Sequence, residues 1–136
     1  MFLVYQPEGS EEPQRWSYNP RKLMDVEREV IERRTEMTFA EFTQAVVKGS
    51  SLARRALLFV MLKREHPTTK YDDVHFLWDE LKLEYSKQEY DVLLVNASDE
   101  LTGETREGVL EKLREEQATA FEDTELEGKV QPPVVG

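Results

Sequence analysis

Hydrophobic positions along this chain are grouped into short segments, and the densest group lies in residues 51–65, SLARRALLFVMLKRE. This segment holds the longest apolar run in the sequence, with a pair of basic residues at each end of the run. Its Leu, Ala, Met and Arg content favours a helix, a serine pair offers an N-cap, and Pro67 follows the end. We therefore predict a central helix that is apolar on nearly every side and must be covered by other elements or by a partner.

The N-terminal segment alternates between apolar runs and turn residues. A short apolar run, Phe2 to Tyr5, is followed by the turn-rich QPEGSEEPQ and then by Arg15 to Tyr18, where large aromatic and small polar side chains alternate. Two such runs around a glycine-containing loop are typical of a β-hairpin. Because an isolated hairpin is marginal in water, we expect it to pack on the helices through Phe2, Val4, Trp16 and Tyr18.

Two amphipathic helices are predicted before the central one. Asn19-Pro20 is a helix start, since Asn caps a helix and Pro suits its first position, and this helix should end near Thr35 to Met37. The second begins at the capping box Thr38-Phe-Ala-Glu41 and ends at Lys48-Gly49. Their apolar positions recur at helical spacing, namely Leu23, Val26, Val30 and Ile31 in the first helix and Phe39, Phe42, Val46 and Val47 in the second.

Two further helices are expected after the break at His66-Pro67. Apolar residues from Tyr71 to Leu81 recur every three to four positions and predict one helix. Ser86-Lys-Gln-Glu89 is a second capping box. This box favours a helix over a strand for the apolar run that follows it, Tyr90 to Val95.

The character of the chain changes near residue 98. Residues 1–97 carry 17 acidic and 14 basic side chains, whereas residues 98–136 carry 11 acidic and 4 basic ones. Apolar residues are sparse in this last stretch, although residues 107–118 have the spacing of a helix. We expect a hairpin plus helical domain over 1–97 and a flexible, weakly ordered acidic arm over 98–136. The predicted fold class is mainly α, with about five helices and an N-terminal β-hairpin.

Composition limits the classes of function. At a formal net charge of -10, the chain lacks the basic footprint that general nucleic-acid binding requires. The absence of cysteine excludes disulfides and favours a reducing compartment. The N-terminus lacks the basic and apolar regions of an export signal, and no apolar run approaches the roughly 20 residues that cross a bilayer. We expect a cytoplasmic protein with protein partners and neither nucleic acid nor membrane as partner.

The sequence offers no evident catalytic residues. His66 and His75 are the two histidines, and their spacing matches no common catalytic or zinc motif. Asp72, His75 and Asp79 would share one face of the predicted helix. We favour helix capping and surface solvation over a metal site there, because two carboxylates and one imidazole meet this spacing commonly by chance. We expect a non-enzymatic protein without a cofactor or a metal.

Candidate partner-binding residues come from the aromatic and apolar helix faces and from the basic pair at the start of the central helix. They are Trp16, Phe39, Phe42, Val46, Arg54, Arg55, Phe59 and Trp78. The competing interpretation assigns the aromatic residues to the core and the basic pairs to solvated helix ends. If the basic pairs do bind, an acidic partner or the acidic arm of this chain is the complementary surface.

Residues 16–78 also contain several short sequence motifs in a fixed order. These are W-x-Y-N-P before a helix, then MTFAEF, KGS, an apolar helix ending LKRE-x-P, and KYDDV. The order resembles the tail assembly chaperones of long-tailed, siphovirus-type phages that infect actinobacteria. The resemblance covers about half of the chain, and the acidic tail adds nothing to it beyond being tolerated in that family.

This resemblance implies a non-catalytic protein of the host cytoplasm that coats the tape measure protein and keeps it soluble. Such a protein helps to recruit tail tube subunits, can form homo-oligomers and is absent from the mature virion. The family commonly makes a longer product by ribosomal frameshifting. Glu127-Gly128-Lys129 is compatible with a slippery sequence, so we expect this chain to be the short, unshifted form. Two alternatives remain, a permanent tail or head-tail connector protein and an acidic mimic of DNA.

Overall fold

The computed structural model describes residues 1–123 of the 136-residue chain. The described chain is mostly helical and has a small three-stranded antiparallel sheet, so the mainly helical class and the N-terminal hairpin are confirmed. Within residues 1–123, two compact units are present, Leu3–Leu83 and a second formed by Met1–Phe2 with residues 84–123. The residues considered for frameshifting, 127–129, lie outside the described residues.

The sheet contains one strand that the sequence pattern did not predict. The hairpin strands are β1 (Phe2–Tyr5) and β2 (Gln14–Ser17), and β3 (Leu81–Glu84) pairs with the other edge of β1 to give the order β2-β1-β3. The backbone N–H of Gln6 continues this pairing by donating to the carbonyl of Glu80 over 2.8 Å. The sheet therefore closes the first unit by joining its beginning to its end.

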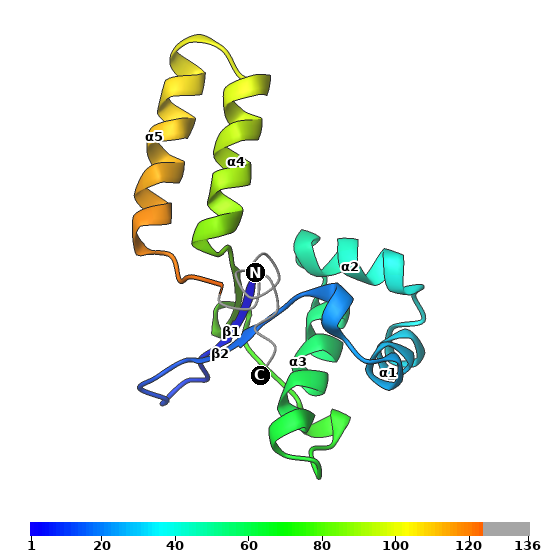
Figure 1. Cartoon of the computed structure of the whole chain (residues 1–136). Coiled ribbons are helices and arrows are strands. Elements are labelled where there is room, and N and C mark those ends of the chain that lie inside the picture. Colours follow the sequence, from blue (N-terminus) through cyan, green and yellow to red (C-terminus); the bar gives the residue numbers. More distant parts are fainter. Residues whose placement is uncertain (124–136) are drawn as a thin grey trace, which may run out of the picture. The chain divides into compact units, whose positions relative to one another are not determined.

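Three helices form the core of the first unit (Figure 1). They are α1 (Asp25–Thr35), α2 (Phe39–Lys48) and α3 (Ser51–Glu65), and each packs against the other two. The bounds of α3 agree with the prediction, and the Ser50 hydroxyl caps its start by accepting from the N–H of Ala53. Seven residues of α3 are buried, as expected for the helix that the others must cover, namely Ala53, Ala56, Leu57, Leu58, Phe59, Val60 and Met61.

The helix start predicted at Asn19-Pro20 is correct only for a single turn. The Asn19 side chain accepts from the N–H of Arg21 and caps a 3₁₀ turn, Pro20–Lys22. The chain is then extended at Leu23 and Met24, and α1 begins afterwards. The predicted end is confirmed, because Glu36 adopts the left-handed conformation that terminates α1.

The helix predicted from Tyr71 to Leu81 is wrong. This segment forms two 3₁₀ turns, Tyr71–Asp73 and Trp78–Glu80, followed by β3. Its apolar residues do not share one buried face, since Val74 and Leu81 are buried whereas Leu77 and Trp78 are exposed. The helical spacing of these apolar residues therefore does not reflect a helix, because each residue has a different environment in an irregular segment.

The second unit contains an antiparallel pair of helices, α4 (Lys87–Glu100) and α5 (Gly103–Thr119), which lie side by side (Figure 1). The helix predicted from the capping box is confirmed, because the Ser86 hydroxyl accepts from the N–H of Glu89 at the start of α4. The boundary predicted after residue 97 falls within α4, and α5 occupies much of the described part of the predicted acidic arm.

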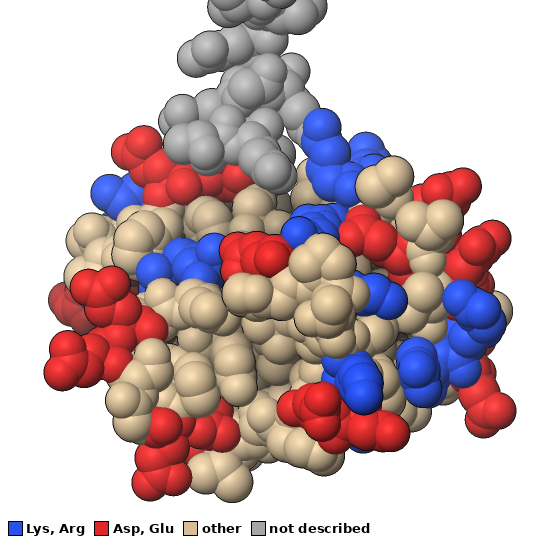
Figure 2. All heavy atoms as spheres, turned by 90° about the horizontal axis from the view of Figure 1, so that it is seen from below, with Lys and Arg blue, Asp and Glu red and all other residues tan. Residues whose placement is uncertain are grey.

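Charge is distributed very unequally between the two units. Residues 3–83 carry 14 acidic and 13 basic side chains, whereas residues 84–123 carry 12 acidic and 4 basic ones. On the face shown in Figure 2, Lys and Arg side chains are interspersed with Asp and Glu rather than gathered in one basic patch. Within residues 1–123, no helix is both long and apolar enough to cross a membrane.

Candidate protein-binding surfaces

One exposed apolar surface of the first unit is formed where α3 begins and where the chain returns toward the sheet. We call Leu52, Leu77 and Trp78 the Trp78 surface; their side chains are 43%, 58% and 67% exposed. Beside them lies a hollow of about 390 Å³, which is lined by Ser51, Leu52, Arg55, Val74, His75, Phe76 and Trp78. Large apolar side chains at such exposure, next to a concave site, are typical of a surface that binds another protein.

The position of Trp78 depends on the turn between α2 and α3. Gly49 ends α2 in the left-handed conformation, with φ of 92°. The tryptophan ring lies so close to this turn that a Cβ at Gly49 would stand 3.2 Å from the Cη2 atom of Trp78. The guanidinium carbon of Arg54 lies 5.7 Å from the centre of the same ring. Glycine therefore provides both the turn and the space against which Trp78 packs.

The basic pair Arg54 and Arg55 anchors the backbone around this surface. The Nε of Arg54 donates to the carbonyl of Val46 over 2.9 Å, which joins α3 to the end of α2. Arg55 donates from Nε to the carbonyl of Val74 over 2.8 Å and from Nη2 to that of Tyr71 over 3.0 Å. Both side chains are half-buried. Arg55 therefore holds the irregular segment that leads to Trp78, a role that neither interpretation of the basic pair included.

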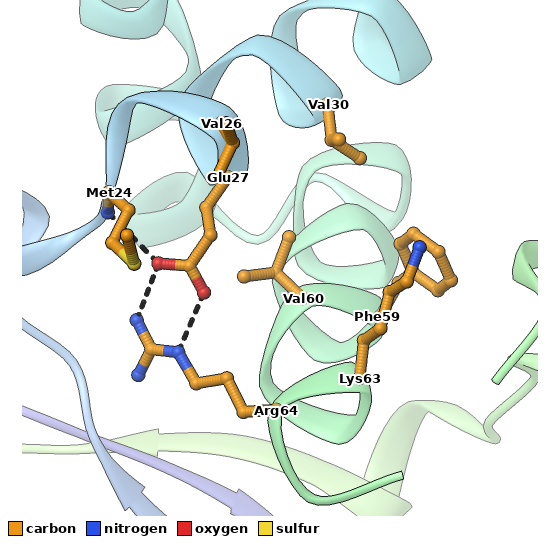
Figure 3. Close-up of a pocket in the computed structure, with 8 residues that line it drawn as sticks. All are labelled: Met24, Val26, Glu27, Val30, Phe59, Val60, Lys63 and Arg64. Carbon is orange, nitrogen blue, oxygen red and sulfur yellow. Dashed lines mark hydrogen bonds and ion pairs between the residues drawn. The ribbon is translucent and has the colours of Figure 1, made fainter. Parts of the chain in front are cut away.

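A second apolar site of the first unit is a groove between α1 and α3 (Figure 3). Its volume is about 330 Å³, and its lining residues are Met24, Val26, Glu27, Val30, Phe59, Val60, Lys63 and Arg64. Met24 is 63% exposed and Val26 is 54% exposed. The groove thus presents apolar side chains with basic residues at the α3 side.

An ion pair closes one end of the α1–α3 groove. Arg64 donates from Nε and Nη2 to the two carboxylate oxygens of Glu27, over 2.7 Å and 2.9 Å (Figure 3). Glu27 also accepts from the backbone N–H of Met24. The hydrogen bond from Arg64 is the main reason that the pKa of the Glu27 carboxyl lies below its ordinary value. Glu27 is therefore ionised at neutral pH and fixes the start of α1 to α3.

The eight candidate partner-binding residues are not brought together in one site. Trp78 lies on the Trp78 surface, and Arg54 and Arg55 support it. The remaining five lie elsewhere in the unit: Phe42, Val46 and Phe59 are buried, Phe39 is half-buried and stacks on Phe42, and Trp16 is half-buried with its Nε1 donating to Glu65. Phe42 and Val46 are fully buried and support the fold, whereas the buried Phe59 also lines the α1–α3 groove.

Sequence reasoning missed Leu52 and Leu77 of the Trp78 surface and Met24 of the α1–α3 groove. Leu77 is one of the apolar residues between Tyr71 and Leu81 whose spacing predicted a helix. Met24 lies inside the helix predicted from Asn19-Pro20, but in the structure it immediately precedes α1. No local signal distinguishes an apolar residue that is buried from one that remains exposed for a partner.

Residues Asp72, His75 and Asp79 do not share a helix face, because the segment that contains them is not a helix. Within residues 1–123, no group of three His, Cys, Asp or Glu side chains is arranged to hold a metal ion. The chemistry available at the Trp78 surface and at the α1–α3 groove is apolar contact bordered by charge.

No protein-family model, no curated protein and no solved structure matches this chain.

Proposed function

We propose that this chain is a non-catalytic assembly chaperone that binds the tape measure protein of a long-tailed phage and keeps it soluble during tail assembly. The observation that supports this most directly is the exposure of Trp78 together with Leu77 and Leu52 beside a concave site. Leaving this much apolar area in water is unfavourable by about 25 cal/mol per Å². A partner that covers it recovers that free energy.

The class of partner follows from the shape and chemistry of the surface. An exposed tryptophan and two exposed leucines provide apolar contacts for the apolar face of an amphipathic helix. A tape measure protein is long and largely helical, so it offers many such helix faces. The short sequence motifs between residues 16 and 78 support this choice of partner, because their order resembles that of the actinobacteriophage chaperones. In this proposal, recruitment of tail tube subunits is a second protein contact.

Co-expression with the tape measure protein of the same phage tests the proposal. We expect the wild-type chain to raise the soluble fraction of the tape measure protein, and the double variant Leu77→Ser with Trp78→Ser to lose most of this effect. Val47→Ser is the matched control, because Val47 of α2 is 51% exposed and lines neither the hollow beside the Trp78 surface nor the α1–α3 groove. An equally insoluble tape measure protein with and without the wild-type chain would exclude the chaperone function.

A permanent component of the tail or of the head-tail connector is the main alternative. Mass spectrometry of purified virions separates the two, since a chaperone is absent from the virion and a structural component is present at a stoichiometric level. An acidic mimic of DNA is a further alternative, because the acidic residues of 84–123 lie largely on helices rather than on an irregular arm. Arg106, Lys112 and Arg114 interrupt the acidic residues along α5, which is unfavourable for a phosphate-like row.

A further inference from the structure

The α4–α5 pair has apolar side chains that the described chain does not cover. Neither helix contains a buried residue, although α4 has 14 residues and α5 has 17. By contrast, α3 of the first unit buries seven side chains. Two helices packed on each other cover only one seam, and helices in water owe most of their stability to covered apolar faces.

The side of α4 that faces α5 is identified by hydrogen bonds between the two helices. The Tyr90 hydroxyl donates to the Glu116 carboxylate over 3.3 Å, and the Gln117 amide donates to the Asp91 carboxylate over 2.8 Å. Leu94 and Ala97 follow Tyr90 at helical spacing on this side, and both are half-buried. The apolar residues of α4 that α5 covers are thus accounted for.

Val92 and Val95 lie on the other side of α4. At about 100° per residue, they stand roughly 200° and 140° around the helix from Tyr90. Each is 59% exposed. We call this pair, one turn apart and directed away from α5, the valine face of α4. A helix that is apolar on two opposite sides requires a cover on both.

The charge around the valine face indicates which kind of partner can bind there. Asp99 follows Val95 by one helical turn, and it is exposed. Residues 84–123 as a whole carry 12 acidic and 4 basic side chains. A second copy of the chain would bring the same acidic excess against itself, which is unfavourable. A helix with Lys or Arg beside its apolar stripe would instead be attracted and correctly oriented.

We propose that the valine face of α4 is a docking site for a basic amphipathic helix of another protein, which packs beside α4 as the third helix of a small bundle. This site is separate from the Trp78 surface, and the inference does not depend on the tape measure protein being the partner. Its affinity combines coverage of Val92 and Val95 with attraction between the basic flanks of the helix and the acidic excess of this unit, with Asp99 as the carboxylate beside the valines.

Two synthetic peptides of about 20 residues, long enough to be helical, test the proposal against the full chain. One has a leucine stripe flanked by Lys, and the other has the same stripe flanked by Glu. Fluorescence anisotropy of the labelled peptides should show the Lys peptide binding at least about tenfold more tightly than the Glu peptide. This difference should fall as salt is added, because salt screens exposed charges.

Variants then locate the site. Val92→Ser with Val95→Ser should weaken binding of the Lys peptide by about tenfold or more. Val47→Ser is the matched control, since this valine of α2 is 51% exposed and should leave binding unchanged. Asp99→Asn should weaken binding of the Lys peptide and should not weaken binding of the Glu peptide. Circular dichroism of each variant verifies that its helices are retained.

Three results would overturn the inference. The first is equal binding of the two peptides, or binding of neither. The second is an equal loss for the control and the double variant. The third is self-association in light scattering that Val92→Ser with Val95→Ser abolishes, which would identify a second copy as the cover. The co-expression result with Leu77→Ser and Trp78→Ser is independent of all three, so failure of one proposal does not imply failure of the other.

Discussion

Glu27 of α1 and Arg64 of α3 form a two-point ion pair in which both carboxylate oxygens accept from the same guanidinium group. The carboxylate side chain is 14% exposed and the arginine side chain is 41% exposed. The pair connects the first turn of α1 to the last turn of α3. It therefore fixes the angle at which α1 lies on the central helix and defines one end of the groove between them.

The first unit should consequently be less stable at acidic pH than at neutral pH. The pKa of Glu27 is lowered in the folded chain, chiefly by Arg64, so its contribution is present above the ordinary glutamate pKa and is lost as pH falls through the folded value. Glu27→Gln should reduce the free energy of unfolding at pH 7 by about 1 kcal/mol, a value lowered for the exposure of Arg64. Urea denaturation between pH 7 and pH 3 measures both effects. A Gln variant with the same pH dependence as the wild type would contradict this assignment.

Tyr18 should affect stability in the alkaline range. Its hydroxyl is buried, and no hydrogen-bond partner for it is found among the described residues; burial raises its pKa to about 12. Because the unfolded chain ionises first, the contribution of Tyr18 is present below about pH 10 and is lost between pH 10 and 12.

Removing that hydroxyl should be favourable. Tyr18→Phe is expected to raise the free energy of unfolding at pH 7 by about 1 kcal/mol, since an unsatisfied buried hydroxyl is costly. The variant should also lose less stability between pH 10 and 12 than the wild type does. Denaturation at pH 7 and pH 11 provides the comparison, and a destabilised Phe variant would indicate that the hydroxyl has a partner.

Gly49 should be intolerant of a side chain. Gly49→Ala is expected to cost about 1–2 kcal/mol, because its φ of 92° is unfavourable for any residue with a Cβ. The new methyl group would also meet the Trp78 ring, 3.2 Å away, and displace it. Tryptophan fluorescence in a Trp16→Phe background reports on Trp78 alone.

Gly9→Ala separates the two effects at Gly49. Gly9 has a similar φ of 88°, but a Cβ there would meet no atom within 4 Å. Both variants should therefore lose stability, whereas only Gly49→Ala should change the emission of Trp78. An unchanged emission for Gly49→Ala would mean that the ring does not pack on this turn.

Arg55 should be more important for stability than its position on a helix end implies. Arg55→Met removes the donors to the carbonyls of Val74 and Tyr71 and should cost about 1–3 kcal/mol. Hydrogen exchange should show faster exchange in residues 66–80 than in the wild type. Arg33→Met, at an exposed position of α1, is the control and should change stability by less than about 0.5 kcal/mol. Equal effects of the two variants would show that Arg55 is an ordinary surface residue.

Local signals were sufficient for the helices whose ends carry caps. The box Thr38-Phe-Ala-Glu41, the serine before α3 and the box Ser86-Lys-Gln-Glu89 each mark a helix start that the structure confirms. A cap acts between residues three positions apart, so the sequence contains the whole interaction. For the same reason Gly49 identified the end of α2.

The segment from Tyr71 to Glu84 was determined by tertiary contacts instead. Its apolar spacing agrees with a helix, yet β3 forms because β1 offers an unpaired edge, and Arg55 holds the preceding chain by its carbonyls. Those contacts join residues that are far apart in the sequence, where periodicity carries no information. Helix α5 likewise packs along α4, although its composition alone suggested an acidic arm.

The same distinction between local signals and tertiary contacts applies to the surfaces of the protein. The apolar central helix, the caps around it and the acidic excess of the C-terminal region follow from the order of residues alone. The burial of Phe42 and Phe59 and the exposure of Trp78 depend instead on contacts between distant parts of the chain. The reason is physical: an apolar side chain gains free energy from any cover, and whether that cover belongs to its own chain depends on how the chain folds back on itself.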